Sequence, residues 1–272
     1  MQDAEETLLI GRQHEIRAES MGLARRSTDG LWRKMLADYD AANRGEDFVR
    51  EQIDGVDRFA GLKDRARVLD VGCGAGAQTL EIARRGCRVL GLDPDSSSLA
   101  LARARARAQD KGLWVHFQSC DLRRIPYDAE FNVAVNLHTP LGNLPRELDD
   151  LRCLQSVHKA LKPDGKFLLD LPYRDWLVRN LDPGALAQKV FDLETGLLSQ
   201  GGRSVRVYSL TELGRLLGLA GFAMRGAWGG YDGASFTLSS LRMIVLAAKI
   251  PAEKAPRRVD DLPRAIRIKG RR

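Results

Sequence analysis

The chain has 272 residues, of which 44% are hydrophobic and 29% are charged, so it is long enough for one large globular domain and too apolar for disorder throughout. No apolar run reaches the roughly 20 residues that cross a bilayer, and the acidic stretch Met1–Ile10 has the wrong charge for a secretory signal. We therefore expect a cytoplasmic protein that does not enter a membrane. The four cysteines are far apart in the sequence, so neither a metal site nor a redox motif is predicted.

The net charge of +7 is unevenly distributed along the chain. Residues 251–272 contain eight basic and three acidic residues, and they carry five of the seven net positive charges. The remainder is nearly balanced, which argues against a nucleic-acid-binding surface spread over the domain. Three prolines and a low apolar content predict that this segment is a disordered basic tail, with a phosphate-binding arm as the alternative.

The first 60 residues predict helices that are interrupted twice, at Ser27–Gly30 and at Asn43–Gly45. Apolar side chains recur at helical spacing after each interruption. We expect residues 1–60 to form a helical N-terminal cap that closes over the site as a lid. Tyr39, on the aromatic face of this cap, is predicted to contact the substrate.

Between residues 61 and 250, short β-rich runs alternate with helical runs, which predicts a parallel sheet with helices on both faces. The expected strands are apolar enough to be buried on both sides. The strand runs are Arg67–Val71, Arg88–Asp93, Trp114–Ser119, Phe131–Leu137 and Lys166–Leu171, and the helical runs are Thr79–Arg85, Ser96–Lys111 and Arg146–Leu161.

The last part of this domain has a different character. Val178–Gly202 contains Gly and Pro pairs and only weak periodicity. A helix follows, with Ser209 or Thr211 as its N-cap. The final runs, Phe222–Gly229 and Leu241–Ala248, are joined by a glycine-rich turn and predict an antiparallel hairpin.

The strongest local signal is the run Val68–Ala77, which contains glycines at positions 72, 74 and 76 after the first strand. Glycines let the backbone turn tightly and approach a ligand, and the helix that starts directly afterwards offers free N–H groups. This loop also fits a dinucleotide fingerprint, with Asp93 about 20 residues further on for a ribose. The glycine loop alone therefore leaves a nicotinamide cofactor open.

Acidic residues near the ends of three strands favour a different ligand. Asp70 stands two residues before the first glycine, where a carboxylate suits a cationic ligand better than a pyrophosphate. Asp93 ends the second strand and is placed to accept hydrogen bonds from two ribose hydroxyls. Asp121 follows the third strand, where it can accept from an adenine amino group. A tight turn, Leu161–Lys166, precedes the fifth strand.

In this order and spacing, these residues resemble the class I S-adenosylmethionine (SAM)-dependent methyltransferases over roughly Arg67–Leu171, and the late helix and hairpin resemble the small-molecule branch of that family. The resemblance implies an α/β fold with a Rossmann-like, mostly parallel sheet of seven strands and an antiparallel C-terminal strand. It implies S-adenosyl-L-methionine as cofactor and S-adenosyl-L-homocysteine (SAH) as product. The cofactor-binding residues that it implies are Asp70, Gly72, Cys73, Gly74, Gly76, Asp93, Pro94, Asp121, Leu122 and Asn136.

The sequence departs from the family pattern at three places. Asp164 stands in the tight turn where glycine is usual. The run Asn136–Asn143 after the fourth strand differs from the Thr-Ser-Phe-Gly-like run of many relatives, and Trp176–Arg206 is short for a substrate cover. These differences concern the acceptor pocket and leave the predicted cofactor unchanged.

The methyl acceptor is expected beyond the carboxyl ends of the strands. Methyl transfer from a sulfonium mainly needs correct placement in a dry pocket, and a base helps where the acceptor must lose a proton. The candidates at this edge are His138, Asp170, Tyr173 and Tyr231. We predict His138 as the catalytic side chain, because it titrates near neutral pH and follows the fourth strand. Tyr173 and Tyr231 join Tyr39 as predicted substrate contacts.

These features predict a SAM-dependent methyltransferase that transfers a methyl group to an N or O atom of a small-molecule acceptor. The alternatives are an RNA methyltransferase that uses the basic tail and a non-catalytic SAM-binding module. The balanced charge of residues 1–250 and the absence of an Asn-Pro-Pro-Tyr run after the fourth strand oppose methylation of nucleic-acid bases. The hairpin and the Lys-Pro turn oppose a nicotinamide dehydrogenase. The sequence leaves the oligomeric state open.

Overall fold

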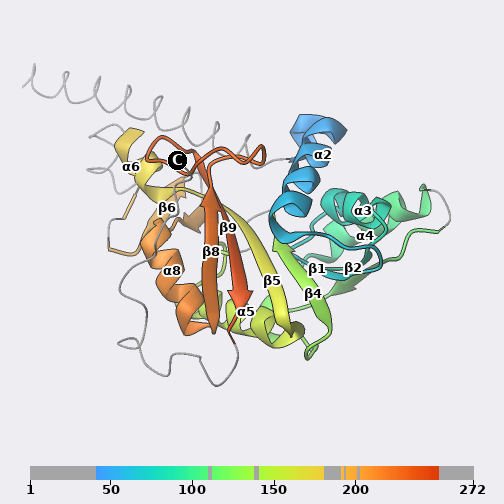
Figure 1. Ribbon diagram of the computed structural model, residues 1–272. Coiled ribbons are helices and arrows are strands. Elements are labelled where there is room, and N and C mark those ends of the chain that lie inside the picture. The colour runs from blue at the N-terminus through green and yellow to red at the C-terminus, as the bar shows by residue number, and fades with distance from the viewer. Residues whose placement is uncertain are drawn as a thin grey trace, which may run out of the picture.

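A seven-stranded sheet forms the centre of the computed structural model, which describes residues 41–109, 112–137, 141–180, 191–192, 194–200 and 203–250 (Figure 1). The strand order is β3-β2-β1-β4-β5-β9-β8. All neighbours pair in parallel except β9, which is antiparallel to both β5 and β8. The predicted fold class is therefore confirmed. The strands are β1 (Arg67–Val71), β2 (Arg88–Asp93), β3 (Val115–Ser119), β4 (Phe131–Asn136), β5 (Leu161–Pro172), β8 (Phe222–Trp228) and β9 (Arg242–Lys249).

Helices cover both faces of this sheet because the central strands are apolar on both sides. On one face, α2 (Ala41–Ala60) and α3 (Ala77–Arg84) pack through Ile53, Val56 and Ile82. On the other face lie α5 (Glu147–Ala160) and α8 (Leu210–Leu219). The helix α4 (Ser96–Arg107) covers β3 at the edge of the sheet.

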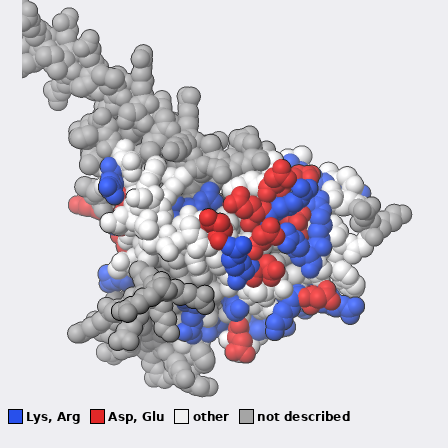
Figure 2. Space-filling view, turned by 45° about the horizontal axis from the view of Figure 1, so that its top comes forward, with Lys and Arg blue, Asp and Glu red and all other residues white. Residues whose placement is uncertain are grey.

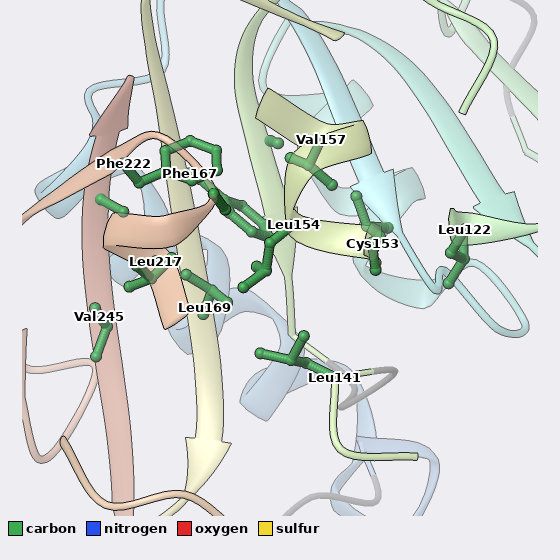
Figure 3. Packing of buried hydrophobic residues seen from close by; sticks show 14 of the residues in the cluster. Leu122, Leu141, Cys153, Leu154, Val157, Phe167, Leu169, Leu217, Phe222 and Val245 are labelled. Carbon is green, nitrogen blue, oxygen red and sulfur yellow. The ribbon is translucent and has the colours of Figure 1, made fainter. Parts of the chain in front are cut away.

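The larger of the two main apolar clusters lies between the sheet and α5 and α8 (Figure 3). Leu154 and Val157 of α5 pack together with Phe167 of β5, and Phe222 of β8 contacts the ring of Phe167 at a centroid distance of 5.7 Å. Ser209 caps α8 with a reciprocal hydrogen-bond pair to Glu212, which settles the choice of N-cap.

The segment after β5 is more ordered than its weak periodicity predicts. It contains α6 (Arg174–Asn180) and a two-stranded antiparallel sheet, β6 (Leu197–Gln200) and β7 (Arg203–Arg206). These short elements share a small hydrophobic cluster of their own: Leu177, Phe191, Leu198, Val205 and Val207. The segment that the sequence analysis described as short for a substrate cover thus contains a compact substructure after the carboxyl end of β5.

The predicted N-terminal cap is represented by α2, which has one non-helical residue, Gly45 (φ 74°, ψ −175°). Tyr39, His138 and the tail 251–272 lie outside the described residues. The boundaries predicted at residues 60 and 250 therefore stay predictions. Within the described ranges, none of the helices combines the length and apolar character that a membrane crossing requires.

The surface of the described domain carries mixed charge. Figure 2 shows acidic and basic side chains next to one another on the face in view, without a large area of one sign. On α2 and α3 they form exposed ion pairs such as Arg50–Glu46 and Arg85–Asp54. This face offers no continuous cationic track of the kind that follows a nucleic-acid backbone.

Candidate functional site

The glycine loop joins the end of β1 to the start of α3. Gly72, Gly74 and Gly76 all have positive φ (76°, 50° and 79°), a region that favours glycine. The N–H groups of Gly72 and Cys73 donate to the Leu92 carbonyl at 2.7 and 3.0 Å, which fixes the loop against β2. A Cβ atom on Gly74 would meet none of the described residues within 4 Å, so the described part of the chain leaves space for a ligand beside this residue.

Asp93, the last residue of β2, supports this loop from below. Its Oδ2 accepts a hydrogen bond from the Gly74 N–H and its Oδ1 accepts one from the Asp95 N–H, both at 2.8 Å. Asp95 in turn caps α4 by accepting from the N–H groups of Ser97 and Ser98. The carboxylate of Asp93 therefore shapes the loop and lies beside its open position.

Asp70 is a buried carboxyl group directly before the loop, with an exposed fraction of 3%. Its pKa is raised to about 7: burial raises it most, the Thr79 hydroxyl that donates to Oδ2 at 2.6 Å lowers it, and the charge of Asp93 raises it. A cationic ligand next to Asp70 would reverse the main effect, because it favours the ionised form.

Asn136 ends β4 on the other side of β1. Its Nδ2 donates to the Val71 carbonyl at 2.8 Å, while its Oδ1 is buried and has no hydrogen-bond partner within the described part of the chain. An unsatisfied buried acceptor costs about 1–3 kcal/mol, so a ligand that brings an N–H or O–H donor is favoured here. With the open space at Gly74 and the carboxylates of Asp70 and Asp93, this acceptor fits a cationic ligand that carries an amino group and hydroxyls, as SAM does.

Other predicted cofactor residues have their side chains engaged within the protein. The carboxylate of Asp121 accepts from Nε and NH2 of Arg123 at 2.9 Å each, and this guanidinium lowers its pKa. Asp121 also caps the short 3-10 helix η1 (Leu122–Arg124). The side chains of Leu122 and Cys73 are buried in apolar clusters.

On the acceptor side, both described tyrosines of the prediction are buried and bonded. Tyr231 donates its hydroxyl to Asp170 Oδ2 at 2.6 Å. Tyr173 donates to Asp175 at 3.0 Å and packs edge-on against Phe236, and burial raises its pKa to about 12. Both hydroxyl groups are therefore already hydrogen-bonded to neighbouring carboxylates within the protein.

A buried polar cluster for which the sequence carries no local signal holds Gly142, after β4. Asp150 Oδ1 accepts from the Gly142 N–H at 2.8 Å, and its Oδ2 accepts from Tyr208 at 2.7 Å and from Arg206 at 3.1 Å. The Arg206 N–H donates back to the Gly142 carbonyl at 2.8 Å. Gly142, six residues after the end of β4, is thus held against β7 by these hydrogen bonds.

Comparisons with known proteins agree with this geometry. Residues 68–165 match the family model described as a methyltransferase domain. A putative methyltransferase of Bacillus subtilis, YqeM, is 30% identical over 113 residues, which are 41% of this chain and 44% of that protein. The chain thus spans less than half the length of this curated relative.

Two further relatives are similar over more of their length. The cypemycin N-terminal methyltransferase of Streptomyces sp. is 24% identical over 210 residues, 67% of this chain and 83% of that protein. The Burkholderia thailandensis 1,6-didemethyltoxoflavin-N1-methyltransferase, solved with its acceptor and SAH, has a TM-score of 0.56 at 21% identity and covers 83% of this chain and 90% of its own. From the glycine loop, the strand order and these matches, we conclude that the chain contains a class I SAM-dependent methyltransferase domain.

Proposed function

We propose that the protein transfers the methyl group of SAM to an N or O atom of a small-molecule acceptor. The observation that carries this proposal is the glycine loop: no described residue lies within 4 Å of a Cβ position on Gly74, and the N–H of Gly74 donates to the carboxylate of Asp93 at 2.8 Å. Bound SAM supplies a methyl group that is already activated on a sulfonium. The protein's own contribution is then to bind, to orient and to exclude water.

Each described site residue has a role in this proposal. Asp93 accepts hydrogen bonds from the ribose hydroxyls, and Asp70 lies toward the cationic methionine end of the cofactor. Asn136 Oδ1, which has no donor within the described residues, accepts from the cofactor's ammonium group. Asp121 accepts a hydrogen bond from the adenine amino group through the carboxylate lone pairs that Arg123 does not use.

His138 is proposed as the group that orients the acceptor or takes up its proton. It follows the end of β4, whose neighbour β1 carries the glycine loop. The hydrogen bonds that hold Gly142 to Asp150 and Arg206 support this role, because they fix the chain four residues after His138. A restrained loop keeps a reactive side chain near its productive position.

The names of two relatives favour nitrogen as the acceptor atom. One acts on the N-terminus of cypemycin, and the other on N1 of a small heterocycle. A third, the ubiquinone biosynthesis O-methyltransferase of Ruegeria pomeroyi, is 32% identical over 44% of this chain and is named for an oxygen acceptor, so the proposal keeps both a nitrogen and a hydroxyl. An acceptor of either kind must lose a proton after or during transfer, which gives His138 its task.

Two measurements test the proposal. Calorimetry should show that SAH binds the protein, and binding of a nicotinamide dinucleotide in preference to SAH would refute it. The protein is then incubated with SAM and a metabolite extract, and the compound that gains the mass of one methylene group is identified by mass spectrometry. SAH binding without any methylated product would instead favour a SAM-binding module without catalysis.

A further inference from the structure

A chain of buried hydrogen bonds crosses the protein from α3 to the end of β5. Gln78 Nε2 donates to Gln52 Oε1 at 2.9 Å, and Gln52 Nε2 donates to the Tyr231 hydroxyl at 3.2 Å. Tyr231 donates to Asp170 Oδ2 at 2.6 Å, and Arg242 donates to the same oxygen at 2.9 Å. All five residues are less than 9% exposed, and they belong to α2, α3, β5, β9 and the loop between β8 and β9.

Every bond in this chain points in the same direction, toward the carboxylate of Asp170. Bonds arranged in this way polarise one another in a medium from which water is excluded. Burial and the charge of Asp170 raise the pKa of Tyr231 far above its ordinary value, so its hydroxyl stays a donor. Arg242 balances the negative charge at the end of the chain.

The ring of Tyr231 also packs directly against α2. A Cβ atom on Gly55 would lie 2.6 Å from Tyr231 Cδ1, so only glycine lets the helix approach this closely. Phe48 meets the same ring edge-on at a centroid distance of 6.5 Å, and the guanidinium of Arg242 lies 5.6 Å from the ring centroid. The turns of α2 between Phe48 and Gly55 are therefore placed by Tyr231.

Both ends of this series of hydrogen bonds lie near residues of the proposed site. Gln78 is in the first turn of α3, two residues after Gly76 of the glycine loop. Asp170 lies near the carboxyl end of β5, beside β4, whose end carries Asn136 and leads to His138. Stability alone does not explain such a network, because well-packed apolar residues often serve a buried site equally well. The positions that the network connects suggest that it couples the glycine loop to the acceptor side of the site.

Resting on the function proposed above, we propose that Gln78 and Gln52 are positioning residues that transmit occupancy of the glycine loop to α2, which Tyr231 and Asp170 anchor on its other side, so that cofactor binding fixes α2 beside the acceptor position. A ligand at the glycine loop restrains the first turn of α3, and with it Gln78. Through Gln52, the same restraint reaches the part of α2 that rests on Tyr231. The consequence is an ordered reaction in which the donor binds first and completes the acceptor site.

Amide hydrogen exchange of the full chain, with and without SAH, tests this coupling because it reports local opening at each segment. In the wild type, SAH should slow exchange at the glycine loop and also at residues 46–56 of α2, at least about fivefold, the lower end of typical coupling between sites. Gln78→Met removes the amide that joins α3 to Gln52 of α2 and keeps a side chain of similar length. In this variant SAH should still protect the glycine loop, while its effect on α2 falls below about twofold.

Asp54→Asn is the matched control, because it breaks another link between α2 and α3, the exposed ion pair of Asp54 with Arg85. It should retain the wild-type response of α2 to SAH. Gln52→Met removes the same hydrogen bond from the side of α2 and should reproduce the effect of Gln78→Met, so that a folding defect in one variant cannot account for the result.

The outcomes separate the two proposals. If SAH protects the glycine loop but leaves α2 unchanged in the wild type, or protects α2 equally in the wild type and in both chain variants, the coupling is overturned and the proposed function stands. If SAH neither binds nor protects the glycine loop, the proposed function fails, and the coupling fails with it.

Discussion

Replacing Asp93 with alanine is the most direct test of the cofactor site. The proposed function gives this carboxylate two ribose hydroxyls as partners, in addition to the N–H groups of Gly74 and Asp95 that it already accepts from. A hydrogen bond to a charged group contributes about 1.5–3 kcal/mol. Loss of two such bonds at the lower value weakens SAH binding by about 3 kcal/mol, which is about 150-fold in Kd.

The same change should lower stability, since the two N–H groups lose their acceptor. Asp93 is only partly buried, so water can replace it, and we expect a loss of about 1 kcal/mol for each bond in the free energy of unfolding. Asp95→Ala is the matched control. It removes the carboxylate that caps α4 and should also lower stability, but it leaves Gly74 and Asp93 in place.

Calorimetric titration with SAH, together with urea unfolding, measures both quantities for each variant. We expect the Kd for SAH to rise strongly in Asp93→Ala and to stay unchanged in Asp95→Ala. If Asp93→Ala binds SAH within about threefold of the wild type, the carboxylate does not hold the ribose, because two lost bonds cannot cost so little. Equal weakening in both variants would show that loss of the loop structure is responsible.

Three further predictions concern charge and catalysis. Because burial raises the pKa of Asp70 from 3.8 to about 7, the free energy of unfolding should fall as the pH rises between these values, and urea titrations at several pH values should find this slope absent in Asp70→Asn. Arg242→Met removes the buried ion pair with Asp170 and should lower the unfolding free energy by about 3 kcal/mol. Arg67→Met, at an exposed ion pair, should cost less than about 1 kcal/mol in the same assay. His138→Ala should reduce turnover of the identified acceptor by roughly 10²–10⁴ with unchanged SAH affinity, and a change smaller than about threefold would assign catalysis to proximity alone.

The arrangement of the glycine loop and its neighbouring carboxylates could be predicted from the sequence because these residues are close together along the chain, while their contacts with a cofactor stay a prediction. The glycine loop and Asp70 belong to one run of ten residues, Val68–Ala77, and Asp93 ends the next strand. Their positions follow from strand, turn and helix geometry alone. The alternating strands and helices likewise determined the sheet, since parallel strands require a crossover connection.

The acceptor side was less predictable because its contacts join distant parts of the chain. Gln52 and Tyr231 are 179 positions apart, and Tyr231 and Asp170 are 61 apart, so no local pattern connects them. Tyr231 could be identified as a candidate, but its carboxylate partner decides what its hydroxyl does. The strands β6 and β7 could not be predicted for another reason: strands of four residues carry too few side chains to show a periodic pattern.

Strand β5 begins earlier than the sequence suggests, and register explains the difference. Leu161 already pairs with Phe131, before the turn that was expected to precede the strand. Pairing then resumes at Lys166 opposite Val133, after a shift in register. The turn is thus an irregularity inside the strand, and only the backbone pairing reveals it.

The reversed direction of β9 determines how this protein can be attached to a surface. Lys249, the last residue of β9, pairs with Phe222, and Ala248 pairs with Lys166 of β5. Lys166 lies toward the amino end of β5, whereas the glycine loop follows the carboxyl end of the parallel strand β1, so the end of β9 lies on the opposite side of the sheet from the loop. A tether joined after Ile250 therefore starts on the side away from Gly74. Immobilisation through this end would leave the cofactor entrance facing the solution, which suits a sensor chip or a flow reactor.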